Sequence, residues 1–320
     1  MRSVGFAILL LILSSGCAAA QPAPETGYID TAPGVSIYYE RYGDGPNVVI
    51  VPGRLFMPEF AQLARADRTL IQYDMRNRGA SRPVADVSQL TIIEDVADLE
   101  AVRRHFAAER ASLVGYSYLG LMVALYATEH PDKVARLVQI GPVPRQFGTP
   151  YPADQTAGEE TLSPDGMAAR RAWAAARETA TRASDPVALC RLQAAASNYW
   201  LVGNPANHTR VPDPCRYENE HPFTAQRHLN ASFADIQTRQ FPKASFVSLT
   251  APVLTIHGTL DRNAPYGSGL EWASTFADGR LVTVDGGAHQ VWLDDPEVIT
   301  DVSDFFDGRW PERARSFGRR

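Results

Sequence analysis

The sequence predicts an α/β protein with a mainly parallel central sheet, flanked by helices and interrupted by an inserted helical cap. Runs of consecutive apolar residues, such as 47–51, are typical of strands that are buried on both faces. Segments with apolar residues at helical spacing separate these runs, and this alternation indicates crossover helices between parallel strands. The strand pattern stops between residues 142 and 246, a stretch too long for a loop, so helices are expected there.

The expected elements follow in chain order. A hairpin is expected at 27–42, where β-branched and aromatic residues flank a turn at 32–34. Core strands are expected at 47–51, 69–73, 112–115, 136–140, 253–256 and 281–284. Core helices are expected at 92–106, 118–130, 268–276 and 296–306, and cap helices at 167–182, 186–201 and 223–240. This order divides the chain into a signal segment at 1–20, a core at 21–141 and 247–310, a cap at 142–246 and a solvated basic tail at 311–320.

The composition is that of a globular protein. Of the 320 residues, 45% are hydrophobic and 21% are charged. The formal net charge of -5 argues against a nucleic-acid-binding protein, which needs a basic surface. The sequence contains neither a zinc-binding motif nor a glycine-rich phosphate loop, and the cap histidines His208, His221 and His228 lack a ligand spacing. No cofactor or metal is therefore expected.

The first residues are typical of an export signal. Arg2 precedes an apolar segment at 4–13 that is too short for a stable membrane-spanning helix. Residues 18–20 (AAA) fit a cleavage site that would release a soluble protein, whereas residues 14–17 resemble a bacterial lipobox that would place a lipid on Cys17. Both routes predict export, either to the bacterial periplasm or as a membrane-anchored lipoprotein. An uncleaved anchoring helix is disfavoured because no stop-transfer charges follow it.

Two further cysteines, Cys190 and Cys215, lie in the expected cap. An exported chain matures where disulfides persist, so we expect these two cysteines to pair. The closed loop would contribute roughly 3 kcal/mol by its effect on chain entropy. The alternative is two separate buried thiols.

A strand, a Gly-x-Ser turn and a helix follow one another around residues 115–120 (GYSYLG). This is the layout of a nucleophile elbow, in which a strained strand-to-helix turn exposes a serine hydroxyl, here that of Ser117. Leu119 stands where the motif's second glycine belongs, and Gly120 follows it. Because a serine hydroxyl is a poor nucleophile, it needs a base and a fixed position before it can react.

Three further segments accompany the elbow. Residues 51–54 (VPGR) follow an early core strand, residues 256–265 (IHGTLDRNAP) follow a late one, and residues 286–290 (GGAHQ) follow the last one. Together with the elbow, and in this order, they resemble the α/β hydrolases that carry a helical cap. Within that group the chain is most similar to the proline-iminopeptidase-like peptidases and esterases. The resemblance covers the chain after the signal segment.

The resemblance implies a catalytic triad of Ser117, Asp261 and His289. His289 would take the proton of Ser117 and later give one to the leaving group. Asp261 would hold the imidazole in the required tautomer. The backbone N–H groups of Arg54 and Tyr118 would form the oxyanion hole.

Other positions depart from the family pattern or take a different role. Pro52 replaces the family's histidine, which leaves a backbone donor at position 54 intact. The loop at 74–83 resembles the family's Asp-x-Arg-Gly-x-Gly-x-Ser segment and is expected to be structural, and His257 is expected to be an ordinary histidine at a strand end.

Acidic cap residues of proline iminopeptidases bind the free amino group of the substrate, and Glu218 resembles them. The alternative for Glu218 is an exposed acidic loop.

These features predict an exported serine hydrolase that cleaves an ester or amide bond of a small molecule or short peptide through an acyl-enzyme on Ser117. A proline-iminopeptidase-like aminopeptidase and a carboxylesterase without amine recognition are both consistent with the sequence. A binding or sensor protein on a hydrolase scaffold is the third alternative, because of the departures at Leu119 and Pro52.

Overall fold

A computed structural model of the protein describes residues 23–180, 185–218 and 220–317. The signal segment predicted at 1–20, with Cys17, lies outside the described residues. In the described part of the chain, no helix is both long and apolar enough to cross a membrane.

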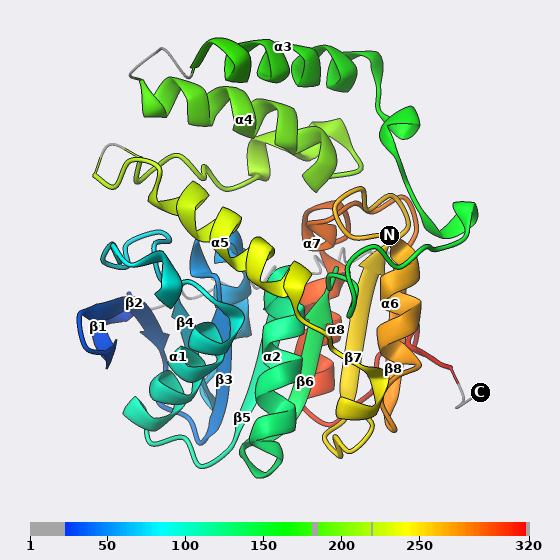
Figure 1. The fold of residues 1–320 in the computed structure, drawn as a ribbon. Coiled ribbons are helices and arrows are strands. Elements are labelled where there is room, and N and C mark those ends of the chain that lie inside the picture. Colours follow the sequence, from blue (N-terminus) through cyan, green and yellow to red (C-terminus); the bar gives the residue numbers. More distant parts are fainter. Residues whose placement is uncertain (1–22, 181–184, 219, 318–320) are drawn as a thin grey trace, which may run out of the picture.

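The described strands form one nine-stranded sheet in the order β1-β2-β4-β3-β5-β6-β7-β8-β9 (Figure 1). Their bounds are β1 (Glu25–Ala32), β2 (Val35–Tyr42), β3 (Asn47–Pro52), β4 (Arg68–Tyr73), β5 (Ala111–Tyr116), β6 (Val134–Ile140), β7 (Val253–Gly258), β8 (Gly279–Val284) and β9 (Arg315–Ser316). Strands β3 to β8 run parallel, and the pairs at the two ends of the sheet are antiparallel. The predicted α/β architecture with a mainly parallel sheet is therefore confirmed.

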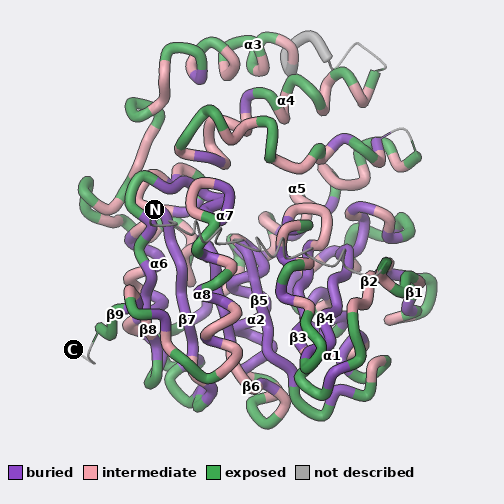
Figure 2. The backbone as a smooth tube through the Cα atoms, turned by 180° about the vertical axis from the view of Figure 1, so that it is seen from behind, coloured by how far each residue is buried: buried purple, intermediate pink, exposed green. Residues whose placement is uncertain are grey.

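Helices cover both faces of this sheet. One face carries α1 (Ile92–His105), α2 (Tyr118–Glu129) and α6 (Tyr266–Ala273), and the other carries α7 (Val291–Asp294) and α8 (Glu297–Phe306). Alternate residues of each core strand enter different apolar clusters, as Ile50 does on one face and Val49 and Val51 do on the other. The strands are consequently buried on both sides, as Figure 2 shows for the centre of the molecule.

Two features of the fold differ from the prediction. Helix α7 is a single turn, too short to produce a periodic sequence pattern, and it was not predicted. Part of the basic tail pairs with the sheet, where β9 lies beside β8, although both residues of β9 are exposed to solvent as predicted. The ion pairs of Arg313 with Asp295 and Asp301 hold this segment against the core.

The segment between β6 and β7 contains three long helices, α3 (Pro164–Ala180), α4 (Pro186–Leu201) and α5 (Thr224–Thr238). Figure 1 shows them above the carboxyl ends of the core strands, with α5 next to the sheet and α3 and α4 farther out. Short 3₁₀ turns lie at η1 (Arg54–Phe56), η2 (Pro58–Leu63), η3 (Val87–Gln89), η4 (Pro131–Lys133), η5 (Ala153–Gln155), η6 (Glu159–Thr161), η7 (Pro205–Arg210) and η8 (Lys243–Ser245).

The two cap cysteines form a disulfide, as predicted. Cys190 of α4 and Cys215, in the turn-rich segment before α5, are joined with a Cα–Cα distance of 5.7 Å. The bond ties the outer helix pair to the segment that leads into α5, so it limits the movement of the cap.

Replacing both cysteines by serine is expected to lower the free energy of unfolding by roughly 3 kcal/mol, because the unfolded chain regains the freedom of the open loop. Urea unfolding under non-reducing conditions measures the change. Reduced wild-type protein should unfold at the same urea concentration as the double variant, and reductant should leave the variant itself unaffected. An unchanged midpoint in the double variant would contradict this role of the disulfide.

Candidate active site

Ser117 occupies the sharp turn between β5 and α2. Its φ of 58° and ψ of -123° are strained for a residue with a side chain, as is usual for a nucleophile held in a tight turn. The N–H of Ser117 donates to the carbonyl of Ile140 (2.8 Å), and the N–H of Gly120 donates to the carbonyl of Ser117 (2.9 Å). Ser117 is partly exposed between the buried residues Tyr116 and Tyr118, so the turn leaves it accessible.

Leu119 fits into this elbow because glycines take the crowded positions around it. A Cβ atom on Gly115 would lie 2.2 Å from the carbonyl oxygen of Leu119, and one on Gly120 would lie 2.9 Å from Cβ of Pro142. A Cβ atom on Gly53 would lie 2.6 Å from Cδ1 of Leu119, so the leucine side chain fills space that this glycine leaves open. The elbow is therefore repacked around the leucine.

Asp261 and His289 form a buried hydrogen-bonded pair at the carboxyl ends of β7 and β8. His289 Nδ1 lies 2.6 Å from Asp261 Oδ2, and the carboxylate is fully buried. Oδ1 of Asp261 accepts the backbone N–H groups of Asn263 (2.8 Å) and Ala264 (2.9 Å). These bonds fix the carboxylate in the orientation that holds the imidazole.

The electrostatics of this pair favour a charged carboxylate. Burial by itself would raise the pKa of Asp261, but the interaction with His289 and the hydrogen bonds from both His289 and His257 hold that pKa well below its usual value. Because an ionised carboxylate has no proton to donate, Nδ1 of His289 is the donor in the contact. In the neutral imidazole the proton is therefore on Nδ1, and Nε2 is the nitrogen that can act as a base.

His257 is a second neighbour of Asp261 that the sequence analysis did not connect with the site. Its fully buried ring places Nε2 3.2 Å from Asp261 Oδ2 and 3.0 Å from the carbonyl oxygen of Ala264. Both neighbours are acceptors, so Nε2 carries the proton. The four-residue spacing between His257 and Asp261 spans a turn after β7, and spacing alone could not reveal the contact.

The end of β6 brings the serine and the Asp261–His289 pair together. Ile140 accepts the N–H of Ser117, and a Cβ atom on the next residue, Gly141, would lie 3.0 Å from Asp261 Oδ2 and 3.1 Å from His289 Nδ1. The rings of Tyr116 and His289 lie 4.7 Å apart between centroids. All three residues of the predicted triad are thus at the same edge of the sheet, beneath the cap.

The turn after β3 supplies the second part of the site. Gly53 has a φ of 80°, and the 3₁₀ turn η1 begins at Arg54. Arg54 and Tyr118 are the first residues of their helical turns, so their N–H groups have no partner inside those turns. The Arg54 guanidinium pairs with Glu40 (2.9 Å) and Asp74 (2.6 Å), which leaves the backbone N–H as the group that Arg54 offers to the site.

Glu218 lies in the cap turn before α5 and is 7% exposed. Its Oε2 atom accepts the N–H of Phe223 at 2.9 Å, so the carboxylate closes the turn that begins the helix. The residue is buried and has a structural partner, which differs from the exposed acidic loop given above as one alternative.

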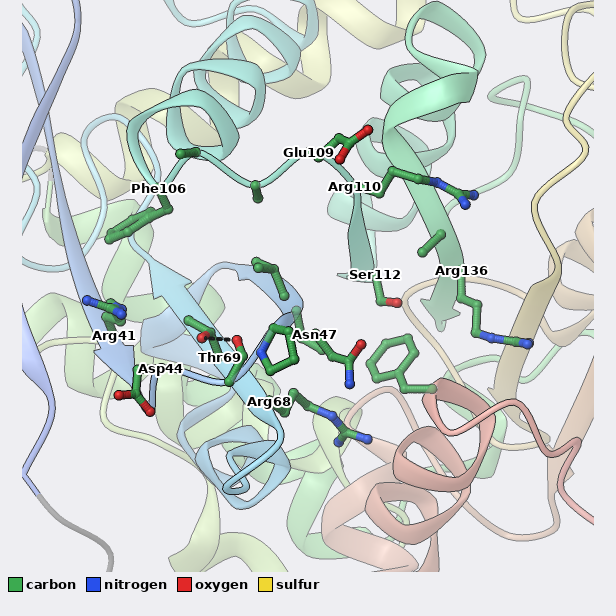
Figure 3. A pocket seen from close by; sticks show the side chains of 18 of the residues that line it. Arg41, Asp44, Asn47, Arg68, Thr69, Phe106, Glu109, Arg110, Ser112 and Arg136 are labelled. Carbon is green, nitrogen blue, oxygen red and sulfur yellow. Dashed lines mark hydrogen bonds between the residues drawn. The ribbon is translucent and has the colours of Figure 1, made fainter.

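A separate cavity of about 880 Å³ lies at the opposite edge of the sheet (Figure 3). It opens at the amino ends of β3, β4 and β5, where the labelled residues Asn47, Arg68 and Ser112 lie. None of Ser117, Asp261 and His289 is among its lining residues. The predicted triad and this cavity are at opposite ends of the same strands.

Comparison with known proteins relates most of the chain to one family. The sequence model of the alpha/beta hydrolase fold matches residues 46–296. An esterase from Exiguobacterium antarcticum has a similar structure, with a TM-score of 0.66 over 88% of this chain and 98% of that chain. The two are 16% identical, so this likeness concerns the fold.

Curated relatives are similar over shorter stretches. A probable proline iminopeptidase of Leptolyngbya boryana is 30% identical over 112 residues, which cover 33% of this chain and 35% of the relative. A serine hydrolase of Mus musculus, BPHL, is 27% identical over 113 residues, which cover 33% of this chain and 39% of the relative. The chain therefore matches little more than a third of the length of these relatives.

Proposed function

Because the chain belongs to the α/β-hydrolase fold family, we propose that it is a serine hydrolase that cleaves an ester or amide bond through an acyl-enzyme on Ser117. The observation that carries this proposal is the buried Asp261–His289 hydrogen bond at the sheet edge where the strained Ser117 turn also lies. The sequence similarity to a serine hydrolase and to proline iminopeptidases is consistent with it.

The reaction follows from the roles of these groups. Nε2 of His289 removes the proton of the Ser117 hydroxyl as its oxygen attacks the substrate carbonyl. The N–H groups of Arg54 and Tyr118 stabilise the negative oxygen of the tetrahedral intermediate, and each such donor is worth roughly 3 to 4 kcal/mol. His289 then protonates the leaving alcohol or amine. Water, activated by the same imidazole, hydrolyses the acyl-enzyme and restores Ser117.

A fluorophosphonate probe tests the proposal directly, because it reacts with activated serines. Purified mature protein is expected to be labelled, with the label located on Ser117 by mass spectrometry, and to hydrolyse 4-nitrophenyl esters. Absence of both labelling and turnover would overturn the proposal in favour of a binding or sensor protein on a hydrolase scaffold.

An aminopeptidase of the proline iminopeptidase type is the second candidate function. The buried carboxylate of Glu218 and the similarity to proline iminopeptidases favour it over a carboxylesterase without amine recognition. In this case Glu218 would pair with the free amino group of the substrate.

Glu218→Gln then lowers kcat/KM for proline naphthylamide by about 10- to 100-fold, because a charged hydrogen bond is lost. The amide oxygen still accepts the N–H of Phe223, so the turn is kept. Hydrolysis of a neutral 4-nitrophenyl ester measures the general effect on the site, and Glu220→Gln, two residues away and exposed, is the matched control. Equal losses on both substrates, or no loss, would exclude amine recognition by Glu218.

We also propose that the protein acts outside the cytoplasm. The signal-like residues at 1–20 and the Cys190–Cys215 disulfide support this location. Cell fractionation with radioactive fatty-acid labelling separates a periplasmic protein from a lipoprotein modified at Cys17, and recovery of unprocessed protein in the cytoplasm would contradict export.

A further inference from the structure

Arg78, in the loop after β4, lies between the core and the cap beside the proposed site. Its Nε–H donates to Nδ1 of the buried His228 in α5 at 3.2 Å. Its guanidinium carbon lies 5.6 Å from the centroid of the Phe56 ring, at the end of the turn that begins with Arg54. These two contacts, one from the cap and one from the core, fix the guanidinium in place.

The other nitrogen of the His228 ring faces the carboxylate of Asp95. Because Arg78 donates to Nδ1, the ring proton of His228 is on Nε2, which lies 3.5 Å from Oδ2 of the buried Asp95. The hydroxyl of Tyr118 donates to the same oxygen at 2.7 Å. Arg78 is therefore linked, through two side chains, to the residue that follows the proposed nucleophile.

The charge of Arg78 has no contacting counter-ion among the described residues. The two neighbouring arginines differ in this respect, since Arg76 pairs with Asp98 (2.7 Å) and Arg54 pairs with Asp74 (2.6 Å). Burial lowers the pKa of Arg78 to about 10, against the more distant attraction of Asp95 and Glu218. The guanidinium is thus still protonated at neutral pH.

A buried charge without a contacting partner destabilises a protein, and an apolar side chain would fill the same space at lower cost. Arg78 as a whole residue nevertheless stays partly exposed, and its two terminal nitrogens donate no hydrogen bond to the described residues. A planar guanidinium presents two parallel donors that fit the two oxygens of a carboxylate. A single unpaired positive charge balances a carboxylate better than a phosphate monoester, which carries nearly two negative charges at neutral pH.

We propose that Arg78 binds a carboxylate of the substrate whose ester or amide bond is cleaved at Ser117, so that the protein acts on acidic substrates. This inference rests on the proposed serine hydrolase function. His228 acts as a positioning residue, because it holds the guanidinium from the side of the cap. The sequence carries no signal for this site, because the 74–83 loop resembles a structural segment and His228 lacks a ligand spacing.

The test compares two esters of matched length, the mono-4-nitrophenyl ester of adipic acid and 4-nitrophenyl hexanoate. Wild-type protein is expected to prefer the acidic ester. Arg78→Met lowers the ratio of the two kcat/KM values by about 10- to 100-fold, chiefly through KM, because a charged hydrogen bond is lost. Arg78→Lys keeps part of the preference, and Arg82→Met, an exposed arginine of the same loop, leaves the ratio unchanged.

Calorimetric titration with adipate provides a readout that needs no turnover. Wild-type protein binds adipate and Arg78→Met binds it more weakly. An unchanged ester ratio together with unchanged adipate binding would overturn the Arg78 proposal while leaving the hydrolase intact. If neither ester is hydrolysed but adipate binding still depends on Arg78, the serine hydrolase function fails and the carboxylate site stands.

Discussion

Replacing Ser117 with alanine is expected to lower kcat for ester hydrolysis by roughly 10⁴- to 10⁶-fold, the loss seen when a triad serine is removed. The imidazole of His289 and the oxyanion donors stay in place, but no oxygen is left to form the acyl-enzyme. What activity persists comes from binding and from stabilisation of the oxyanion. The measurement is kcat on 4-nitrophenyl hexanoate, with fluorophosphonate labelling as a second readout.

Ser112→Ala is the matched control for Ser117→Ala. Ser112 is buried at the other end of the same strand, β5, so it reports the effect of losing a serine hydroxyl from this strand without touching the turn. Its kcat should stay near the wild-type value. Substantial turnover or undiminished labelling in Ser117→Ala would mean that a different residue is the nucleophile.

Asp261→Asn is expected to lower kcat by about 10⁴-fold while the fold is kept. The amide oxygen can still accept the N–H groups of Asn263 and Ala264, so the amide NH₂ turns toward His289. The amide NH₂ group and a protonated Nδ1 of His289 are both donors and cannot form a hydrogen bond with each other. Nδ1 of His289 must therefore become the acceptor. The ring proton then moves to Nε2, which can no longer accept the proton of Ser117.

The same substitution has a pH signature in stability. The pKa of Asp261 is held below its usual value in the folded protein, so its charge stabilises the fold above the unfolded-state pKa of about 3.9, and this contribution is lost as the pH falls through the folded pKa. The difference in unfolding free energy between wild type and Asp261→Asn should therefore shrink below about pH 4. Asp285→Asn, an exposed acid on the neighbouring loop, should show neither the kinetic loss nor this pH dependence.

The core of the fold could be predicted because burial leaves a regular trace in the sequence. Continuous apolar runs such as 47–51 and 253–256 correspond to strands that pack on both faces, and the break in this pattern after Ile140 corresponds to the start of the cap segment. Short elements left no such trace. The two residues of β9 and the four of α7 are defined by contacts with the rest of the fold rather than by periodicity.

The sequence could predict which loops carry the residues of the candidate site. It could not predict which side chains contact one another there. The sequence does not distinguish Arg76 from Arg78, which lie two residues apart in one loop. Only the folded chain pairs Arg76 with Asp98, while no carboxylate of the described residues contacts Arg78. The fit of Leu119 in the elbow could not be predicted either, because its side chain occupies space beside Gly53, a residue distant in the sequence.

The contact of Leu119 with Gly53 also affects how this protein can vary. The elbow after β5 and the turn after β3 share one small volume. A side chain at position 53 would be strained by the φ of 80° and would also need a smaller residue than leucine at position 119. Replacing Leu119 with the motif's usual glycine would leave an unfilled space beside the turn after β3. The two positions are therefore coupled, and homologues with a leucine at position 119 are expected to keep a glycine at position 53.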